Sequence, residues 1–285
     1  YDGVRMIYEK VLVVTKPEPD DLTNEVCEKV VNFCKDNDIR WTFYPATYGY
    51  DTTNVLVVAI GGDGTMLSAM RESLRYQDSL VWGINTGTLG FLSGERTDNI
   101  ITTLINIGRN FGKIEERMAL TARVYVDGSL WVNDAVALNE IVLAPMTIQS
   151  PLTTEVYIND KFVSKQQGSG VLVSTSTGST AMSLSAGGAI VSPSTNIMQI
   201  VPIMAHTLTS RPVITTGRDT ITLKAKLPVN RNAVEVYADG RVLESAYPDD
   251  GEEIEIKIAK NEDVVKVYRP ENWDFFNVLR DKMKW

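Results

Sequence analysis

Short apolar runs alternate with amphipathic segments along the first third of this chain. Apolar positions recur every three or four residues from Leu22 to Cys34, which is the spacing of one helix face. The runs between such segments are short and bounded by turn residues, as β-strands are. We therefore expect strands at residues 10–15, 39–44, 54–60 and 80–84, and helices at residues 22–34 and 66–71. This order predicts a parallel sheet with helices on both faces, a doubly wound α/β domain.

After about residue 115 the pattern changes to β-rich runs separated by turn pairs. Asp-Gly or Asn-Asp pairs separate such runs at residues 127–128, 159–160 and 239–240, which predicts three β-hairpins. This part of the chain is therefore expected to be mostly antiparallel β, with one helix at about residues 179–186. Near the end, the aromatic residues around Trp273 predict a short apolar helix that packs back on the first domain.

Composition and charge exclude several classes of function. A chain of 285 residues can bury a sizeable core and suits two ordinary domains. Its net charge is -8, from 28 basic and 36 acidic residues, which is not the charge of a general binder of nucleic acid or anionic membranes. No apolar run approaches the ~20 residues that a membrane span needs. A phosphorylated ligand must therefore be held by a local arrangement of residues.

The two cysteines and the single histidine bear on redox state and on metals. Cys27 and Cys34 lie on one face of the predicted helix but about 10 Å apart along its axis, too far for a disulfide. Two reduced thiols facing the core fit a cytoplasmic protein. His206 is the only histidine, so no pattern of Cys and His ligands exists and we expect no protein-held metal site. Beside an apolar strand, we expect this histidine to be a hydrogen-bonded structural group.

The segment Gly61-Gly62-Asp63-Gly64-Thr65 joins a predicted strand to a predicted helix. Glycines let the backbone approach an anion closely, and the N–H groups at a helix N-terminus point toward it. The carboxylate of Asp63 would repel phosphate, which suggests a task such as holding a metal or accepting a proton. An Asp-Gly pair is also common in a tight turn, so these residues alone leave both interpretations open.

Two further segments carry polar groups near predicted strands. The loop of residues 85–92 follows a strand of the parallel sheet, and ligands bind beyond the carboxyl ends of such strands. Within this loop, we expect the aromatic ring of Phe91 to fill a space in the core. Asn139 and Glu140 interrupt an apolar run, although adjacent side chains face opposite sides of a regular strand. A bulge, a ligand or an exposed strand end would each explain the pair. An amide beside a carboxylate suits ribose hydroxyls.

A third segment is rich in hydroxyl groups. Residues 168–188 run from a strand into a Ser/Thr loop and then into a helix of small residues. Ser and Thr can cap that helix, and small side chains leave room for a flat ligand. A generic polar loop would explain the hydroxyl groups but not the density of small residues on both sides.

Taken together, these segments resemble the NAD kinase (ATP-NAD kinase) family over nearly the whole chain and in the family's order. The glycine motif alone is weak, because diacylglycerol, sphingosine and phosphofructo-kinases carry close relatives of it. The segment Ser174-Thr175-Ser176-Thr177-Gly178-Ser179-Thr180-Ala181, followed by Ser185-Ala186-Gly187-Gly188, is much more specific. The resemblance implies an α/β nucleotide-binding domain at residues 1–98, with residues 267–285 packing back on it, and a β-sandwich substrate-binding domain at residues 99–266.

The resemblance also implies an activity and roles for individual residues. The family transfers the terminal phosphate of ATP, or in some members polyphosphate, to the 2′-hydroxyl of the adenosine ribose of NAD, with Mg²⁺ accompanying ATP. Its members are usually homodimers or homotetramers. By position, Asp63 would be the base that deprotonates this hydroxyl. By the same resemblance, Gly62, Gly64 and Thr65 would contact the phosphates and magnesium, and Asn139 and Glu140 would contact the ribose. Thr180, Ala181 and Ser185 would contact the base and the nicotinamide. Leu67 and Phe91 would pack on a base.

The chain departs from the family pattern at three positions. Met182 stands where a tyrosine is common, Ser169 where an aspartate is common, and Thr88 where a histidine is usual. A methionine can cover a flat base but loses ring stacking and a hydroxyl, and a serine removes a charge. These changes alter the expected contacts to the dinucleotide at Ser169 and Met182, while the phosphate motif is intact.

Two alternatives to an NAD kinase follow from the same residues. The three departures suggest a catalytically altered, NAD kinase-like protein that binds or sequesters a dinucleotide, and the intact glycine motif argues against it. A lipid kinase of the diacylglycerol type shares the glycine motif. That class needs an apolar groove or a basic membrane face, which the acidic composition disfavours.

Overall fold

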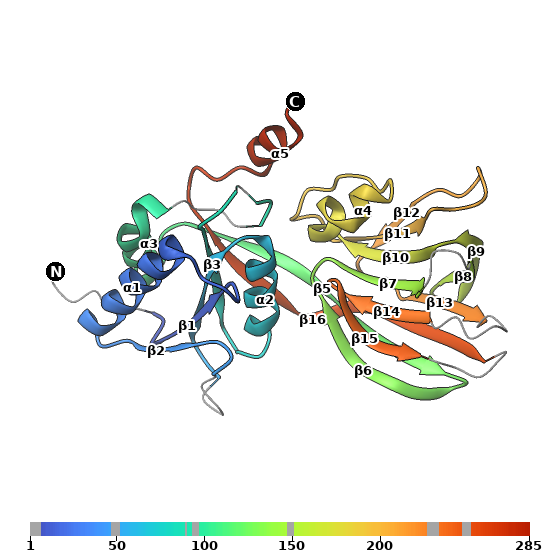
Figure 1. Cartoon of the computed structure of the whole chain (residues 1–285), viewed down its shortest axis with the longest axis horizontal. Coiled ribbons are helices and arrows are strands. Elements are labelled where there is room, and N and C mark those ends of the chain that lie inside the picture. The colour runs from blue at the N-terminus through green and yellow to red at the C-terminus, as the bar shows by residue number, and fades with distance from the viewer. Residues whose placement is uncertain are drawn as a thin grey trace. The chain divides into compact units, whose positions relative to one another are not determined.

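The protein is described by a computed structural model, which covers residues 7–46, 52–88, 90–92, 97–146, 151–226, 234–246 and 252–285. The chain divides into two compact units, Tyr1–Arg117 with Val264–Trp285 (unit 1) and Met118–Asp263 (unit 2). Figure 1 shows both units along the chain. The division expected from the sequence, after residue 98, differs from this one mainly in α3 (Ile100–Gly108), because its apolar residues lie in the core of unit 1.

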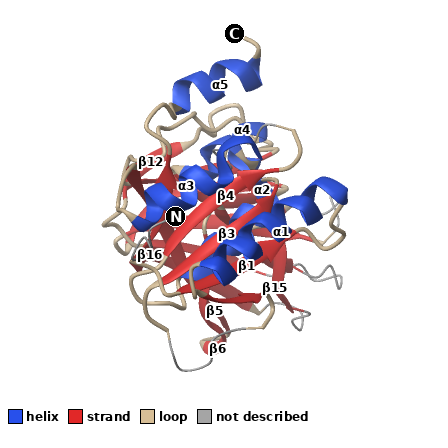
Figure 2. Ribbon diagram, turned by 90° about the vertical axis from the view of Figure 1, so that its left-hand side faces the viewer, coloured by secondary structure: helices blue, strands red, loops and turns tan. Residues whose placement is uncertain are grey.

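Unit 1 is built on a parallel sheet. Its strands are β1 (Lys10–Thr15), β2 (Arg40–Phe43), β3 (Val55–Gly61) and β4 (Leu80–Asn85), close to the four expected from the sequence. They lie in the order β2-β1-β3-β4, and the end of β16 (Glu253–Arg269) continues the sheet with Val267 beside Val81 of β4. β3 and β4 are buried along their whole length because helices cover the sheet. Figure 2 shows β1, β3 and β4 side by side.

Helices cover both faces of this sheet, as the sequence predicted. α1 (Asp21–Asp36) and α3 pack on one face, where their apolar residues join alternate strand residues such as Val13 and Val58 in one core cluster. α2 (Asp63–Ser73) contacts β1, β3 and β4. The strand residues that alternate with Val13 and Val58, such as Leu12 and Val57, face the other side of the sheet and are fully buried. Cys27 and Cys34 are free and buried in α1, as expected.

Unit 2 is a sandwich of two antiparallel sheets. The first sheet contains β5 (Lys113–Val126), β6 (Ser129–Ala137), β8 (Leu152–Ile158), β9 (Lys161–Gly168), β13 (Ile221–Lys226) and the first part of β16. The second contains β7 (Glu140–Pro145), β10 (Gly170–Thr175), β11 (Ile197–Ile203), β12 (Val213–Thr216), β14 (Val234–Ala238) and β15 (Arg241–Ala246). Residues of both sheets meet in one apolar cluster, which is the core of the sandwich.

The three predicted hairpins are confirmed and pair β5 with β6, β8 with β9, and β14 with β15. Both turn residues have positive φ in each hairpin, for example 50° at Asp239 and 73° at Gly240. Two positive φ values define the type I′ turn, whose twist matches that of the flanking strands. Asn, Asp and Gly tolerate this conformation, so local chemistry alone could specify these turns.

Both helices expected in the later part of the chain have counterparts in the structure, but the first of them is not continuous. Instead of one continuous helix at residues 179–186, the chain forms a 3-10 turn, η2 (Thr177–Thr180), and then a single helical turn, α4 (Met182–Ser185), because Ala181 between them is not helical. α5 (Phe275–Met283) belongs to unit 1 and buries Phe275 and Leu279. Among the described residues, no helix has the length and apolar character needed to cross a membrane.

Candidate functional site

The carboxyl ends of β3, β4 and β16 bring three segments of unit 1 to one edge of the parallel sheet. These strands are neighbours and run in the same direction. Asp63 follows β3, the loop that contains Phe91 and Leu92 follows β4, and Arg269 is the last residue of β16. The edge at which such strands end is where α/β sheets bind ligands.

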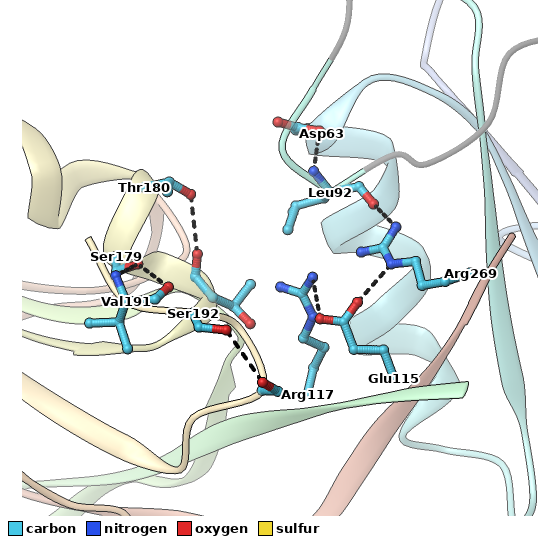
Figure 3. A network of polar contacts seen from close by, with 11 residues as sticks. Asp63, Leu92, Glu115, Arg117, Ser179, Thr180, Val191, Ser192 and Arg269 are labelled. Atoms are coloured by element: carbon cyan, nitrogen blue, oxygen red, sulfur yellow. Dashed lines mark hydrogen bonds and ion pairs between the residues drawn. The ribbon is translucent and has the colours of Figure 1, made fainter. Parts of the chain in front are cut away.

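Asp63, the predicted catalytic base, is held by this loop. It is the first residue of α2. Its Oδ2 accepts a hydrogen bond from the backbone N–H of Phe91 at 2.8 Å. Its Oδ1 accepts one from the backbone N–H of Leu92 at 3.0 Å, which Figure 3 shows. The carboxylate also lies against Gly90, where a Cβ atom would come within 1.8 Å of Oδ1. The carboxylate therefore points in a defined direction. It can do so only because residue 90 is a glycine, whose missing Cβ leaves room for the carboxylate.

The glycine motif places backbone N–H groups at the start of α2. Gly61 lies against the side chain of Thr65, so that a Cβ at position 61 would come within 2.4 Å of its Oγ1. A Cβ at Gly62 or Gly64 would meet nothing within 4 Å, so this side of the helix N-terminus is open. The first N–H groups of a helix have no acceptor within the helix and are suited to bind an anion. Leu67, one turn further on, is half-buried.

The loop after β4 is shaped by Asn85. Its Oδ1 accepts from the N–H of Gly87 at 2.8 Å, and its Nδ2 donates to the carbonyl oxygen of Thr88 at 3.0 Å. The side chain of Thr88 is exposed. Phe91 was expected to plug the core, but it is only half-buried, and its neighbour Leu92 is the buried residue because it lies beneath the loop. The ring of Phe91 instead faces the Nζ of Lys282, 5.8 Å from its centroid.

A buried ionic cluster lies next to this loop. Glu115 bridges two arginines: its Oε2 accepts from Nε of Arg269 at 2.7 Å, and its Oε1 is 2.9 Å from a guanidinium nitrogen of Arg117. Burial lowers the pKa of Arg117 to about 10, with the charge of Arg269 acting in the same direction. Burial also lowers the pKa of Arg269, whereas the charges of Glu115 and Asp63 oppose that shift. Each buried guanidinium is thus compensated by carboxylates.

In unit 2, the predicted pair Asn139 and Glu140 lies where the chain passes from β6 to β7. The strand is interrupted at this point, which is why both side chains are buried. The carboxylate of Asp239, in the turn between β14 and β15, accepts from the N–H of Leu138 at 3.0 Å and from that of Asn139 at 2.7 Å. Two backbone donors that would otherwise lack a strand partner are thereby satisfied.

Glu140 has an unusual electrostatic environment. Burial, and next the charge of Asp239, raise its pKa to about 7, although a backbone hydrogen bond from Met182 opposes the shift. Its Oε2 is buried and has no hydrogen-bond partner among the described residues. A buried oxygen without a partner is costly. A ligand hydroxyl could supply the missing donor.

The hydroxyl-rich segment packs directly against this pair. Oγ1 of Thr175 donates to the carbonyl oxygen of Leu138 at 2.5 Å, and the N–H of Thr175 donates to that of Asn139 at 2.9 Å. Gly178 is so close that a Cβ there would lie 2.2 Å from the carbonyl oxygen of Asn139. The density of small residues in this segment is therefore explained in part by close backbone contact.

The remaining predicted binding residues of unit 2 differ in exposure. Thr180 and Ala181 are half-buried, and Ser169, between β9 and β10, is also half-buried. Met182 is 45% exposed and Ser185 is exposed, so their side chains are accessible to a ligand. The side chain of His206 is exposed as well, and the backbone N–H of this residue donates to the carbonyl oxygen of Gln167 at 2.8 Å.

Four charged residues of these clusters were not singled out from the sequence. Arg117 and Glu115 lie in a strand pattern in which charged residues are usually exposed, and Arg269 ends another such pattern. Asp239 was interpreted only as a turn residue. Among the described residues, no group of three or more His, Cys, Asp or Glu side chains could hold a metal ion.

Comparisons with known proteins agree with these features. The model of the ATP-NAD kinase N-terminal domain matches residues 13–109, and that of the ATP-NAD kinase C-terminal domain matches residues 138–268. The NAD kinase of Shewanella halifaxensis is 38% identical over 230 residues, covering 81% of this chain and 72% of that protein. The NAD kinase of Colwellia psychrerythraea is 39% identical, covering 81% and 76%.

Solved structures share the fold. Yeast NADH kinase complexed with NADH superposes with a TM-score of 0.83 at 21% identity, covering 98% of this chain and 88% of that one. An NAD kinase from Archaeoglobus fulgidus in complex with ATP has a TM-score of 0.72 at 22% identity, covering 96% and 98%. With both domain models matched in order and relatives this similar along most of its length, the chain belongs to the ATP-NAD kinase family.

Proposed function

We propose that this protein is an NAD kinase that transfers the terminal phosphate of ATP to the 2′-hydroxyl of the adenosine ribose of NAD, giving NADP. The observation that carries the proposal is the carboxylate of Asp63, which two backbone N–H groups hold at the start of α2. The solved relatives bind NADH and ATP respectively, which supports both substrates for this chain.

Asp63 would act as the general base. A ribose hydroxyl is a very weak acid, so its attack on phosphorus needs positioning and an acceptor for the proton. Asp63 takes that proton as the 2′-oxygen forms a bond to the terminal phosphorus of ATP. The bond from this phosphorus to the bridging oxygen breaks, and ADP leaves. The N–H groups at the start of α2, at Gly62, Gly64 and Thr65, would hold the phosphates.

Residues of unit 2 would hold the dinucleotide. A ribose hydroxyl both donates and accepts hydrogen bonds, so it can donate to the unpartnered Oε2 of Glu140, with Asn139 beside it. Thr180, Ala181, Met182, Ser185 and Ser169 would contact the base and the nicotinamide. In unit 1, Leu67 and Phe91 would pack on a base.

Mg²⁺ is proposed to arrive with ATP. This ion prefers oxygen ligands and takes most of them from phosphates and water. The donors present at the start of α2, the carboxylate of Asp63 and the hydroxyl of Thr65, are of this class. The ion would neutralise phosphate charge. The family suggests three further expectations: polyphosphate as an alternative donor, a homodimer or homotetramer, and a cytoplasmic location. The two buried free cysteines support the cytoplasmic location.

The Asp63→Asn variant tests the proposal. The wild-type protein, incubated with ATP, Mg²⁺ and NAD, should form NADP, measured with an NADP-specific dehydrogenase. Loss of a general base reduces turnover by about 10²–10⁴-fold. The amide can accept only one of the two backbone hydrogen bonds, so the thermal midpoint must be measured as well.

The exposed Asp98 offers a matched control, because Asp98→Asn makes the same chemical change outside the loop of residues 85–92. It should keep wild-type turnover. Wild-type turnover in Asp63→Asn would refute the catalytic assignment. Tight binding of NAD by the wild-type protein without turnover, with either ATP or polyphosphate, would instead support a dinucleotide-sequestering protein.

A further inference from the structure

Arg269 reaches the loop that holds Asp63 from the opposite end of the chain. Its terminal guanidinium nitrogen donates to the carbonyl oxygen of Leu92 at 2.7 Å. The N–H of the same Leu92 donates to Oδ1 of Asp63 at 3.0 Å. Figure 3 shows this sequence of contacts, from Glu115 through Arg269 and Leu92 to Asp63.

The two hydrogen bonds of Leu92 are tightly coupled. Only two soft dihedral angles, φ and ψ of Leu92, separate its N–H from its carbonyl group. Its side chain is 5% exposed and therefore also restricts movement of the residue. Fixing the carbonyl group thus restricts the direction in which the N–H points, and with it the orientation of the Asp63 carboxylate.

Arg269 is itself held firmly. Its Nε donates to Glu115 at 2.7 Å, its side chain is 3% exposed, and its guanidinium lies 4.1 Å from the ring centroid of Trp273. The planar guanidinium has several donors in a fixed fork, so it can bind the carboxylate and the carbonyl group together. A lysine ammonium is a compact point charge without that fixed geometry. The arrangement therefore uses a property specific to arginine.

A buried ion pair is weak evidence of a stabilising role. Apolar replacements of a buried ion pair are often neutral or stabilising, because desolvation of charges is costly. The C-terminal segment that carries Arg269 contacts the loop a second time, through Lys282 over the ring of Phe91. The two contacts are made to Leu92 and Phe91, the two residues whose N–H groups bind the Asp63 carboxylate.

We propose that Arg269 is a positioning residue for the catalytic base: through Leu92 it fixes the direction of the Asp63 carboxylate. This inference rests on the proposed function, because it assumes that Asp63 accepts the ribose proton. Arg269 contacts neither substrate in this proposal, so its replacement should reduce kcat and leave the KM values for NAD and ATP nearly unchanged.

The test compares Arg269→Met with Arg269→Lys. A misplacement of about 1 Å in an active site can cost about 10²-fold in rate. We expect kcat to fall about 100-fold in Arg269→Met and about 10-fold in Arg269→Lys, which keeps the charge and one donor, with both KM values within about threefold of wild type. Amide hydrogen exchange of the substrate-free protein should become faster at Phe91 and Leu92 in both variants.

Arg75→Met is the matched control. Arg75 is exposed and pairs with Glu72 at the end of α2, away from the loop, so its loss should change neither kcat nor exchange at Phe91 and Leu92. If Arg269→Met does not fold, the kcat and the amide exchange of Arg269→Lys decide whether the proposal holds. A kcat within threefold of wild type per folded molecule, or a loss confined to KM, would overturn the proposal. A wild-type protein without kinase activity would refute the proposed function, whereas unchanged exchange at Phe91 and Leu92 would refute only the positioning role.

Discussion

Asp63 shows how much of this site depends on single residues around it. Its two oxygens accept hydrogen bonds from Phe91 and Leu92, and Gly90 lies against the carboxylate. The sequence identified Asp63 as the one charged residue of a glycine motif but gave no sign of these partners. The carboxylate therefore has a fixed direction, and the residues that fix it are as open to testing as Asp63 itself.

Gly90→Ala should displace the carboxylate of Asp63. An added Cβ would lie 1.8 Å from Oδ1, so either the loop or the side chain must move. We expect kcat to fall about 100-fold, as a misplacement of about 1 Å can cause, with small changes in KM. Gly87→Ala, in the same loop, would place its Cβ 3.9 Å from the nearest atom and serves as the control. Equal kcat values in the two variants would contradict the role of Gly90.

Glu140 should make the stability of the protein depend on pH. Its pKa is raised from 4.5 to about 7 in the folded state, so between these values the unfolded chain releases a proton that the folded protein retains. The contribution of Glu140 to stability is therefore lost as pH rises from about 4.5 to 7, by up to about 3 kcal/mol. Glu140→Gln removes this titration.

Calorimetry of the ligand-free protein at several pH values checks this expectation for Glu140. The thermal midpoint of Glu140→Gln relative to wild type should rise between pH 5 and pH 8 and then level off, because the wild-type carboxylate becomes charged over this interval. Midpoints that differ by a constant amount at every pH would show that Glu140 titrates normally.

Among the elements, the carboxyl ends of β3, β4 and β16 determine where the proposed catalytic base lies. Their order in the sheet puts Asp63, Leu92 and Arg269 at one edge, although Leu92 and Arg269 are 177 residues apart in sequence. α5 continues from β16 and places Lys282 over Phe91. The C-terminal segment is thus part of the structure that supports the catalytic loop.

Leu279→Ala tests the contribution of α5. Leu279 is 5% exposed, and removing a buried leucine side chain costs about 2–5 kcal/mol. At a chain end this loss should appear as undocking of α5, with faster hydrogen exchange over residues 275–283 and at Phe91. Phe276→Ala, at a position 62% exposed, is the matched control and should change neither. Slow exchange of α5 in Leu279→Ala would show that the helix is held by other contacts.

For the whole molecule, the two units supply different parts of the proposed reaction. Unit 1 contains Asp63 and the N–H groups at the start of α2, and unit 2 contains the buried carboxyl of Glu140 and the hydroxyl-rich segment. The matches to the two domain models, at residues 13–109 and 138–268, lie in the same order as these groups. The departures at Thr88, Ser169 and Met182 all concern residues that are exposed or half-buried, so they leave the core intact.

The sequence by itself predicted the four strands of unit 1, the helices α1 and α2 and the three hairpins, because hydrophobic periodicity and turn chemistry are local properties. It did not predict α3, and it took η2 and α4 for one continuous helix. It also marked Asp63, Asn139 and Glu140, since polar residues that interrupt an apolar pattern need a reason. The tertiary structure alone decided which groups these residues meet: Asp239 binds the backbone at Leu138 from 101 residues away. The charge and direction of a buried group depend on neighbours distant in sequence, and for that reason the pKa of Glu140 and the position of Arg269 became visible only in the fold.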